Sequence, residues 1–274
     1  MNKPKKPIET VPSLRVGLAL SGGGARGIAH LGVAKALMEA GIRFSAISGA
    51  SAGAIVGAFL AKGYLPEQIF NFISSIKFLS YVRPSLNGKG ILSMAKMEKL
   101  MLTYFPDDDF ESLKIPLTVV ATDILAGKTT YFNSGPLIKP VLASSSIPGI
   151  FEPITFRDVV YTDGGTLNNL PIEPLTGQVD LLIGSNCNPV GASRPLGNMR
   201  DIVQRSLLLA ANSKTHDRLS QCHIKIEPPE LSNYDVFDIR KAREIFRAGY
   251  EYVKKNPELI RQPLAIAKGL AVAS

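Results

Sequence analysis

The chain has 274 residues, of which 45% are hydrophobic and 20% charged, a composition typical of a soluble globular protein with a sizeable core. It contains no run of 18 or more apolar residues, so we expect no transmembrane helix. The formal net charge of +8 favours contact with an anionic surface such as a lipid membrane, although a merely basic protein has the same charge. The basic residues form no stripe with aromatic residues, so we expect no nucleic-acid partner.

The N-terminal segment, residues 1–13, is predicted to be a disordered basic leader. It is polar and contains several prolines and lysines, and no apolar segment of signal-peptide length follows the lysines. We therefore predict a cytoplasmic protein with, at most, peripheral membrane contact. The two cysteines, Cys187 and Cys222, are too few for a disulfide framework and fit a reducing compartment. With only three histidines in the chain, we expect neither a metal nor another cofactor.

The predicted elements alternate between strands and helices from residue 15 onward. A buried strand over 15–20 is followed by glycines and by a helix over 28–40. A second strand over 44–47 leads into a tight turn over 48–53, and an alanine-rich helix covers 52–61. This order is typical of a parallel sheet that is covered by helices. The sequence therefore predicts an α/β fold with three layers, α/β/α, around a central, mostly parallel sheet.

The rest of the chain continues this mixture of helices and strands. Further helices are expected over 66–76, 93–104 with Ser93 as N-cap, 137–143, 198–219 and 238–255. Further strands are expected over 117–122, 129–133, 159–162, 180–185 and 222–226. Because we find no internal repeat and no long linker, we predict one catalytic domain over 14–255 and a C-terminal tail over 256–274.

A glycine cluster, GGGARG at 22–27, lies between the first strand and the first helix. It fits the G-x-G-x-x-G pattern of dinucleotide-binding loops, but that fingerprint also needs an acidic residue at the end of the second strand. Residues 47–51 at that place, ISGAS, contain no carboxylate, and no G-K-[ST] follows the glycines to make a Walker A loop. Phosphate binding by the glycine loop alone stays open as a hypothesis.

A second glycine motif, GASAG at 49–53, fits G-x-S-x-G between a strand and a helix, which is the context of a nucleophile elbow. Gly49 and Gly53 let the chain turn sharply around Ser51 and let a substrate approach it. The helix that follows places its positive end near the Ser51 hydroxyl. A serine that only caps the helix is the alternative interpretation, and the strand before the motif favours the nucleophile.

If Ser51 attacks an ester, the carbonyl oxygen becomes an oxyanion, which needs donors about 3 Å away. Adjacent parallel strands place their following loops side by side, so the glycine loop is predicted to face Ser51. The expected donors of this oxyanion hole are the backbone N–H groups of Gly22, Gly23, Gly24 and Ala25. Arg26 either adds positive potential to the site or forms an ion pair on the first helical turn.

A serine needs a base to take its proton, and histidine is the usual choice. His216 and His223 have the chain order of an α/β-hydrolase triad, but only two strands precede Ser51, fewer than that fold requires. His216 lies in a polar helical stretch, and His223 has the pattern of a strand residue. His30, on the first helix, is interpreted as structural.

The other candidate base is Asp163, which follows a short strand and is predicted to lie beside Ser51 at the carboxyl edge of the sheet. Gly164 and Gly165 permit a tight turn and close packing against the nucleophile. A free aspartate is a weak base, and partial desolvation raises its pKa, which improves proton transfer. A Ser–Asp dyad is therefore chemically workable without histidine, although D-G-G by itself is also an ordinary turn.

Three motifs in order resemble those of the patatin-like phospholipases, a family of lipid acyl hydrolases with a Ser–Asp dyad. They are GGGARG at 22–27, GASAG at 49–53 and DGG at 163–165. The segment 144–154, SSSIPGIFEPI, is also similar to the one that precedes the aspartate in this family. The resemblance spans about residues 14–185.

This resemblance implies a patatin-like fold in which Ser51 is the nucleophile, Asp163 the base and the glycine loop the oxyanion hole. The activity it implies is metal-independent hydrolysis of a lipid ester, of the phospholipase A or lysophospholipase type. A general carboxylesterase or thioesterase is the alternative enzyme, and a phosphate- or nucleotide-binding module is the alternative of another class. The segment 69–82, IFNFISSIKFLSYV, is either a lid or interfacial helix, or a core helix with its following loop.

Overall fold

A computed structural model describes residues 14–75, 81–85, 89–191, 197 and 199–273. Its centre is an eight-stranded sheet with the order β10-β9-β1-β2-β5-β8-β7, in which β6 also pairs with β5. The five strands from β10 to β5 are parallel, whereas β6, β7 and β8 run antiparallel to their neighbours. The prediction of a mostly parallel sheet is therefore confirmed.

The strands of the sheet are short and most of them are buried. Their bounds are β1 (Val16–Leu20), β2 (Ala46–Ala50), β5 (Leu117–Asp123), β6 (Lys128–Phe132), β7 (Ile154–Phe156), β8 (Val159–Asp163), β9 (Leu181–Ser185) and β10 (Ile224–Ile226). A separate two-stranded sheet is formed by β3 (Arg83–Pro84) and β4 (Leu92–Ser93).

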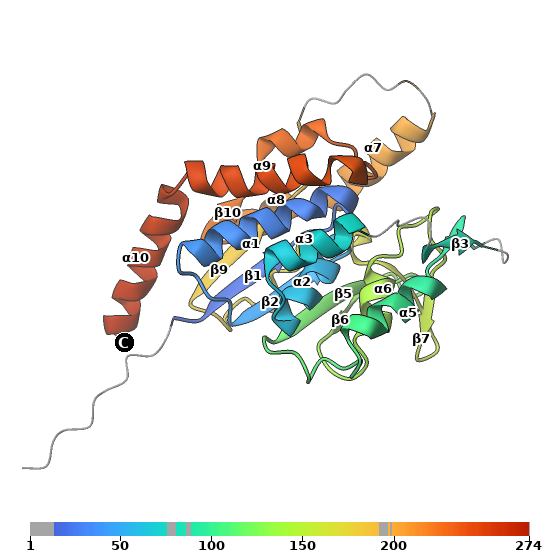
Figure 1. Ribbon diagram of the computed structural model, residues 1–274, viewed down its shortest axis with the longest axis horizontal. Coiled ribbons are helices and arrows are strands. Elements are labelled where there is room, and N and C mark those ends of the chain that lie inside the picture. Colours follow the sequence, from blue (N-terminus) through green and yellow to red (C-terminus); the bar gives the residue numbers. More distant parts are fainter. Residues whose placement is uncertain (1–13, 76–80, 86–88, 192–196, 198, 274) are drawn as a thin grey trace, which may run out of the picture.

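Helices cover the sheet and make the outer layers (Figure 1). On one face lie α1 (Ala29–Glu39), α2 (Ala52–Lys62), α3 (Pro66–Ser75) and α9 (Ala242–Lys255). The other face of β1 and β9 packs against the segment 170–175 and α8 (Thr215–Ser220). The remaining helices are α5 (Ala95–Tyr104), α6 (Ile138–Ser144), α7 (Met199–Asn212) and α10 (Glu258–Ala273), with 3-10 turns η1 (Gly24–Ile28), η2 (Gly164–Thr166), η3 (Pro229–Asn233) and η4 (Ile239–Lys241).

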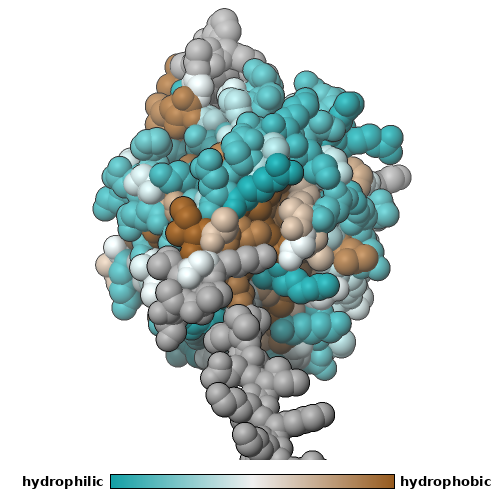
Figure 2. Space-filling model, turned by 90° about the vertical axis from the view of Figure 1, so that its left-hand side faces the viewer, coloured by the Kyte–Doolittle hydropathy of each residue, from teal (hydrophilic) through white to brown (hydrophobic). Residues whose placement is uncertain are grey.

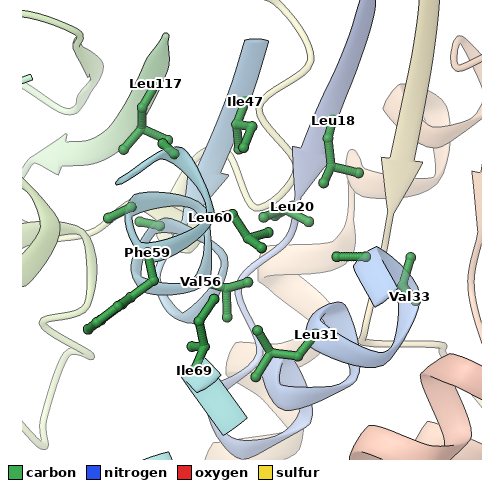
Figure 3. Close-up of a cluster of buried hydrophobic side chains, with 14 of the residues drawn as sticks. Leu18, Leu20, Leu31, Val33, Ile47, Val56, Phe59, Leu60, Ile69 and Leu117 are labelled. Carbon is green, nitrogen blue, oxygen red and sulfur yellow. The ribbon is translucent and has the colours of Figure 1, made fainter. Parts of the chain in front are cut away.

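The core follows from the alternation of side chains along β1. Leu18 and Leu20 point to the face that α1 and α2 cover, and Ala19 points to the opposite face. In Figure 3, aliphatic side chains from the strands meet side chains from α1, α2 and α3, and the labelled ones are Leu18, Leu20, Leu31, Val33, Ile47, Val56, Phe59, Leu60, Ile69 and Leu117. This packing fixes the carboxyl ends of β1 and β2, where the two glycine motifs begin.

Several predicted elements differ in extent from the observed ones. β2 continues to Ala50, because Ser48 and Gly49 pair with β1 and Gly49 and Ala50 pair with β5. The bounds of the predicted turn over 48–53 are therefore wrong, and the turn is confined to Ser51. Ser93 belongs to β4, and α5 begins after Met94. The helix predicted over 198–219 is two helices, α7 and α8.

The segment after residue 255, predicted as a tail, contains α10, which packs against β9 and β10 through buried residues such as Ile260. Among the described helices, none has both the length and the hydrophobicity of a membrane span. The end of the molecule at which α10 lies is covered mainly by hydrophilic residues, with a group of hydrophobic ones near the middle of this face (Figure 2).

Candidate active site

Ser51 occupies a sharp turn between β2 and α2. Its backbone has φ 51° and ψ −123°, a conformation that costs a non-glycine residue about 1–3 kcal/mol. A Cβ on Gly49 would lie 2.4 Å from the Gly53 carbonyl oxygen, and one on Gly53 would lie 2.4 Å from the Leu20 oxygen. Only glycine fits at both places, so β2, α2 and the end of β1 approach closely enough to hold Ser51 in its strained position.

Asp163 is the last residue of β8 and pairs with Ala121 of β5. The Ser51 hydroxyl donates to Asp163 Oδ2 over 2.6 Å, and the Gly165 N–H donates to Oδ1 over 2.7 Å. The sequence predicted this proximity from a parallel arrangement, but β8 is antiparallel to β5. Asp163 nevertheless reaches Ser51, because the carboxyl end of β8 lies at the level of the end of β2.

The site is nearly closed to solvent: Ser51 is 5% and Asp163 7% exposed. Burial raises the pKa of Asp163 to about 6, although the hydrogen bonds from Ser51 and Gly165 act in the opposite direction. The carboxylate is therefore a stronger base than a free aspartate and is still mostly ionised at neutral pH.

The three histidines lie away from this pair. His30 is fully buried behind the glycine loop, where its Nε2 donates to the Ser21 carbonyl over 2.9 Å and its Nδ1 accepts from the Ser185 hydroxyl over 2.8 Å. Burial lowers the pKa of His30 to about 4, so the ring is neutral. His223 precedes β10, and its Nδ1 accepts from the Leu182 N–H, while His216 is exposed on α8.

The glycine loop follows β1 and lies against Ser51. A Cβ on Gly22 would lie 2.9 Å from the Cβ of Ser51. Of the four predicted donors, two are already bonded: the Gly22 N–H donates to the Asn169 carbonyl and the Ala25 N–H donates to the Val236 carbonyl. Within the described residues, the N–H groups of Gly23 and Gly24 have no acceptor. We therefore narrow the candidate oxyanion donors to these two.

Arg26 is buried on η1, and its Nε donates to the Tyr234 carbonyl over 2.8 Å. The guanidinium thus links the glycine loop to the backbone just after η3. Gly164, next to Asp163, is also constrained, because a Cβ there would lie 2.1 Å from the Val120 carbonyl oxygen. Only glycine therefore fits at residue 164, where the chain turns after Asp163 and packs closely against β5.

Three consecutive serines at the C-terminal end of α6 contact the backbone of both members of the pair, a role that the sequence did not predict. Ser144 Oγ accepts from the Ser51 N–H over 2.8 Å. The Ser145 hydroxyl lies 3.3 Å from the Ser51 carbonyl oxygen and 2.9 Å from the Val141 carbonyl oxygen, which compete for its one proton. The Ser146 carbonyl accepts from the Asp163 N–H over 3.0 Å. The one sequence signal for this role was the resemblance of the segment to its counterpart in the family. That resemblance does not reveal which backbone group each serine contacts.

In the part of the chain that the structure describes, no group of three or more His, Cys, Asp or Glu side chains is arranged to hold a metal ion.

The segment 69–82, which the sequence predicted as either a lid or a core helix, is only partly described. Its residues in α3 pack against the core: Ile69 is buried, and the tilted ring of Phe72 has its centroid 5.1 Å from that of Phe59. Residues 76–80 lie outside the described residues.

The fold and the site define an α/β protein with a serine at a strained strand–helix elbow and a carboxylate hydrogen-bonded to it. A family model described as patatin-like phospholipase matches residues 18–176, more than half of the chain. The chain belongs to the patatin-like phospholipase family.

The chain is also similar to individual proteins of this family. An uncharacterised NTE family protein of Mycobacterium tuberculosis is 39% identical over 191 residues, which cover 67% of this chain and 53% of that protein. Lysophospholipase NTE1 of Kluyveromyces lactis is 27% identical over 278 residues, covering 89% of this chain and 19% of that protein. The chain thus spans about half the length of the mycobacterial relative.

Among solved structures, VipD of Legionella pneumophila has a similar fold, with a TM-score of 0.58 at 16% identity. The similarity covers 89% of this chain and 66% of VipD. At this level of identity it supports the fold assignment alone: a central, mostly parallel sheet flanked by helices.

Proposed function

We propose that this protein is a serine lipid acyl hydrolase of the phospholipase A or lysophospholipase type, with Ser51 as nucleophile and Asp163 as base. The observation that carries the proposal is the 2.6 Å hydrogen bond from the Ser51 hydroxyl to the Asp163 carboxylate at a strained elbow. Membership of a phospholipase family and similarity to a lysophospholipase support a lipid ester as substrate.

In the first half of the reaction, Ser51 Oγ bonds to the ester carbonyl carbon while its proton passes to Asp163 Oδ2. The carbonyl oxygen becomes an oxyanion, which accepts hydrogen bonds from the Gly23 and Gly24 N–H groups. When the tetrahedral intermediate collapses, the C–O bond to the alcohol breaks and Asp163 returns the proton to the leaving oxygen. An acyl-enzyme on Ser51 and a free alcohol result.

In the second half, water takes the place of the alcohol. Asp163 accepts a proton from the water as its oxygen bonds to the acyl carbon, and the bond to Ser51 Oγ then breaks. The proton returns to Ser51, and the fatty acid leaves. A single carboxylate serves both halves, because its raised pKa makes it a better base than a free aspartate while it stays ionised near pH 7.

The two alternatives from the sequence make different demands on the site. A phosphate cradle uses several free N–H groups, whereas the N–H groups of Gly22 and Ala25 are bonded within the chain. This favours an oxyanion over a phosphate group. A general carboxylesterase would use the same Ser51–Asp163 pair, so only substrate preference distinguishes it from a lipid hydrolase.

The test is labelling with a fluorophosphonate probe, followed by a panel of phospholipids, lysophospholipids and short-chain p-nitrophenyl esters. We expect the wild-type protein to be labelled and to prefer lipid esters, and folded Ser51→Ala to be neither labelled nor active. Absence of labelling would favour the binding module. Equal turnover of short-chain and lipid esters would favour the general carboxylesterase.

We also propose that the protein contacts a lipid membrane at the edge where Asp163 lies. The turn between β5 and β6 exposes Ile124 and Leu125, and the latter is 81% exposed. The Ile124 N–H donates to Val160 on the strand that carries Asp163. Leu167, just after η2 and four residues after Asp163, is also exposed. Exposed aliphatic side chains around the site, together with the net charge of +8, suit an anionic lipid surface.

A further inference from the structure

The peptide group between Gly22 and Gly23 is held from the side opposite to Ser51. Its carbonyl oxygen, on Gly22, accepts a hydrogen bond from Asn188 Nδ2 and another from Cys187 Sγ at 3.2 Å. Both residues follow β9, and they are 2% and 1% exposed. Burial raises the pKa of the Cys187 thiol to about 11, so the sulfur keeps its proton and can donate. Two donors on one carbonyl fix the orientation of the whole peptide plane.

The order of the strands then determines where the other end of this peptide points. In a trans peptide the C=O and the following N–H point in opposite directions. The glycine loop follows β1, which lies between β9 on one side and β2 on the other. The Gly22 carbonyl points to the β9 side, where Asn188 lies, so the Gly23 N–H points to the β2 side. Ser51 follows β2.

A hydrogen-bonded chain holds the backbone of Asn188, from which its side chain reaches the Gly22 carbonyl. The Asn188 N–H donates to Asn186 Oδ1 over 3.2 Å, and Asn186 Nδ2 donates to Glu227 Oε1 over 2.6 Å. Linked hydrogen bonds polarise one another in a buried environment. These bonds anchor the Asn188 backbone, through Asn186, to a half-buried carboxylate after β10 and so fix the position from which the Asn188 side chain reaches the glycine loop.

The Asn188 amide is not arranged for stability alone. Its Oδ1 is buried and has no partner among the described residues. A buried unsatisfied acceptor costs about 1–3 kcal/mol. An apolar residue of the same shape would avoid this cost but would leave the Gly22 carbonyl with the thiol as its remaining donor. The contribution of Asn188 is therefore the hydrogen bond that its side chain donates to the Gly22 carbonyl.

We propose that Asn188 is a positioning residue of the oxyanion hole, which holds the Gly22 carbonyl so that the Gly23 N–H points at the developing oxyanion. The inference rests on the proposed function. It predicts that the Asn188 amide matters when negative charge has formed on the substrate oxygen and matters little for binding the neutral ester.

The experiment compares Asn188→Leu, which has a similar shape but no donor, with the wild type on a soluble ester. We expect kcat to fall about 10- to 100-fold, less than the ~10²–10³ that follows removal of a donor itself, with KM changed less than about twofold. The second readout is inhibition by a trifluoromethyl ketone, whose carbonyl carbon bonds to Ser51 Oγ and whose oxygen becomes an oxyanion. Its Ki should rise by the same factor as kcat/KM falls.

The matched control is Asn212→Leu. Asn212 is also buried, donates to one backbone carbonyl (Leu208) and leaves its Oδ1 without a partner among the described residues. We expect it to leave kcat and Ki unchanged. If Asn188→Leu does not fold, as judged by circular dichroism, Asn188→Ser carries the same expectations in a smaller polar side chain.

Three results would overturn the inference: kcat within twofold of the wild type in the folded Asn188 variant, a fall in kcat without a matching rise in Ki, or an equal loss in Asn212→Leu. A wild-type protein without Ser51-dependent turnover would overturn the proposed function and this inference with it. Normal wild-type turnover with an equally active Asn188 variant would overturn the inference alone.

Discussion

Replacing Asp163 by asparagine should abolish turnover and at the same time stabilise the folded protein. The amide has nearly the same shape, so both hydrogen bonds can persist, with its oxygen accepting from the Gly165 N–H and its nitrogen donating to Ser51 Oγ. An amide cannot accept the Ser51 proton, so the proposed base is lost. It also carries no charge, so the cost of burying a carboxylate disappears.

The size of the stabilisation follows from the pKa of Asp163, which burial raises from 3.8 to about 6. The folded state binds this proton more tightly than the unfolded state, so the contribution of Asp163 to stability is present below pH 4 and is lost as the pH rises to about 6. The difference corresponds to about 3 kcal/mol above pH 6. Because hydrogen bonds to a neutral amide are weaker than those to a carboxylate, we expect Asp163→Asn to gain about 1–3 kcal/mol at pH 8.

Urea denaturation of the wild type and of Asp163→Asn at pH 8 and pH 4 measures this difference. The stabilisation should be present at pH 8 and vanish toward pH 4. Asp123→Asn is a matched control: Asp123 is equally buried, at 6% exposure, but its Oδ1 accepts from the backbone N–H groups of Leu125 and Ala126 in a turn, and we expect no gain. An Asp163→Asn protein that is less stable than the wild type at pH 8, or that hydrolyses esters, would refute the reasoning.

Three further predictions concern the surroundings of the site. Gly23→Ala places a Cβ 2.4 Å from Cys187 Sγ, which should shift the loop and lower kcat on a soluble ester by about 10²–10³. The control is Gly269→Ala, where a Cβ meets nothing within 4 Å and should have no effect. Equal kcat in both variants would contradict the assignment of the oxyanion hole. Ser144→Ala leaves the Ser51 N–H without its acceptor and should cost about 1–3 kcal/mol in urea denaturation together with a lower kcat; unchanged values would show that this hydrogen bond does not hold the elbow. Co-sedimentation of the wild type with anionic vesicles should fall as salt rises, and Leu125→Asp should weaken it while leaving soluble-ester turnover intact. Ile266→Asp on α10, at the other end of the molecule (Figure 1), should bind as the wild type does. Equal binding of both variants would exclude this edge as the membrane surface.

The sequence predicted the first half of the fold well, because local patterns and tertiary packing agree there. The strand, glycine and helix order around residues 16–62 specifies a parallel start, and the structure confirms it. β2 was predicted too short, because Ser48, Gly49 and Ala50 have the composition of a turn and become a strand only through pairing with β1 and β5. The break between α7 and α8 left no clear signal in the periodicity.

At the candidate site, the sequence predicted the residues that follow strand ends but not the partners that occupy their backbone groups. Gly22 and Ala25 were expected to offer free N–H groups. Their acceptors are the carbonyls of Asn169 and Val236, which lie far away in the chain and which only the folded arrangement brings near. The same holds for Ser144, at the end of α6, and for Asn188, in the irregular segment after β9, because their contacts depend on which way each side chain turns. Local patterns reveal motifs, whereas hydrogen bonds between distant loops need the structure.

The most direct test of the Ser51–Asp163 pair is the pH dependence of kcat/KM on a soluble ester in a variant that carries both His216→Ala and His223→Ala. If Asp163 is the base, kcat/KM rises with pH through a single limb with an apparent pKa of about 6, and the variant retains this limb and most of the wild-type rate. A fall of several orders of magnitude in the folded variant, or loss of the limb, would mean that a histidine takes the proton from Ser51 and would contradict the dyad.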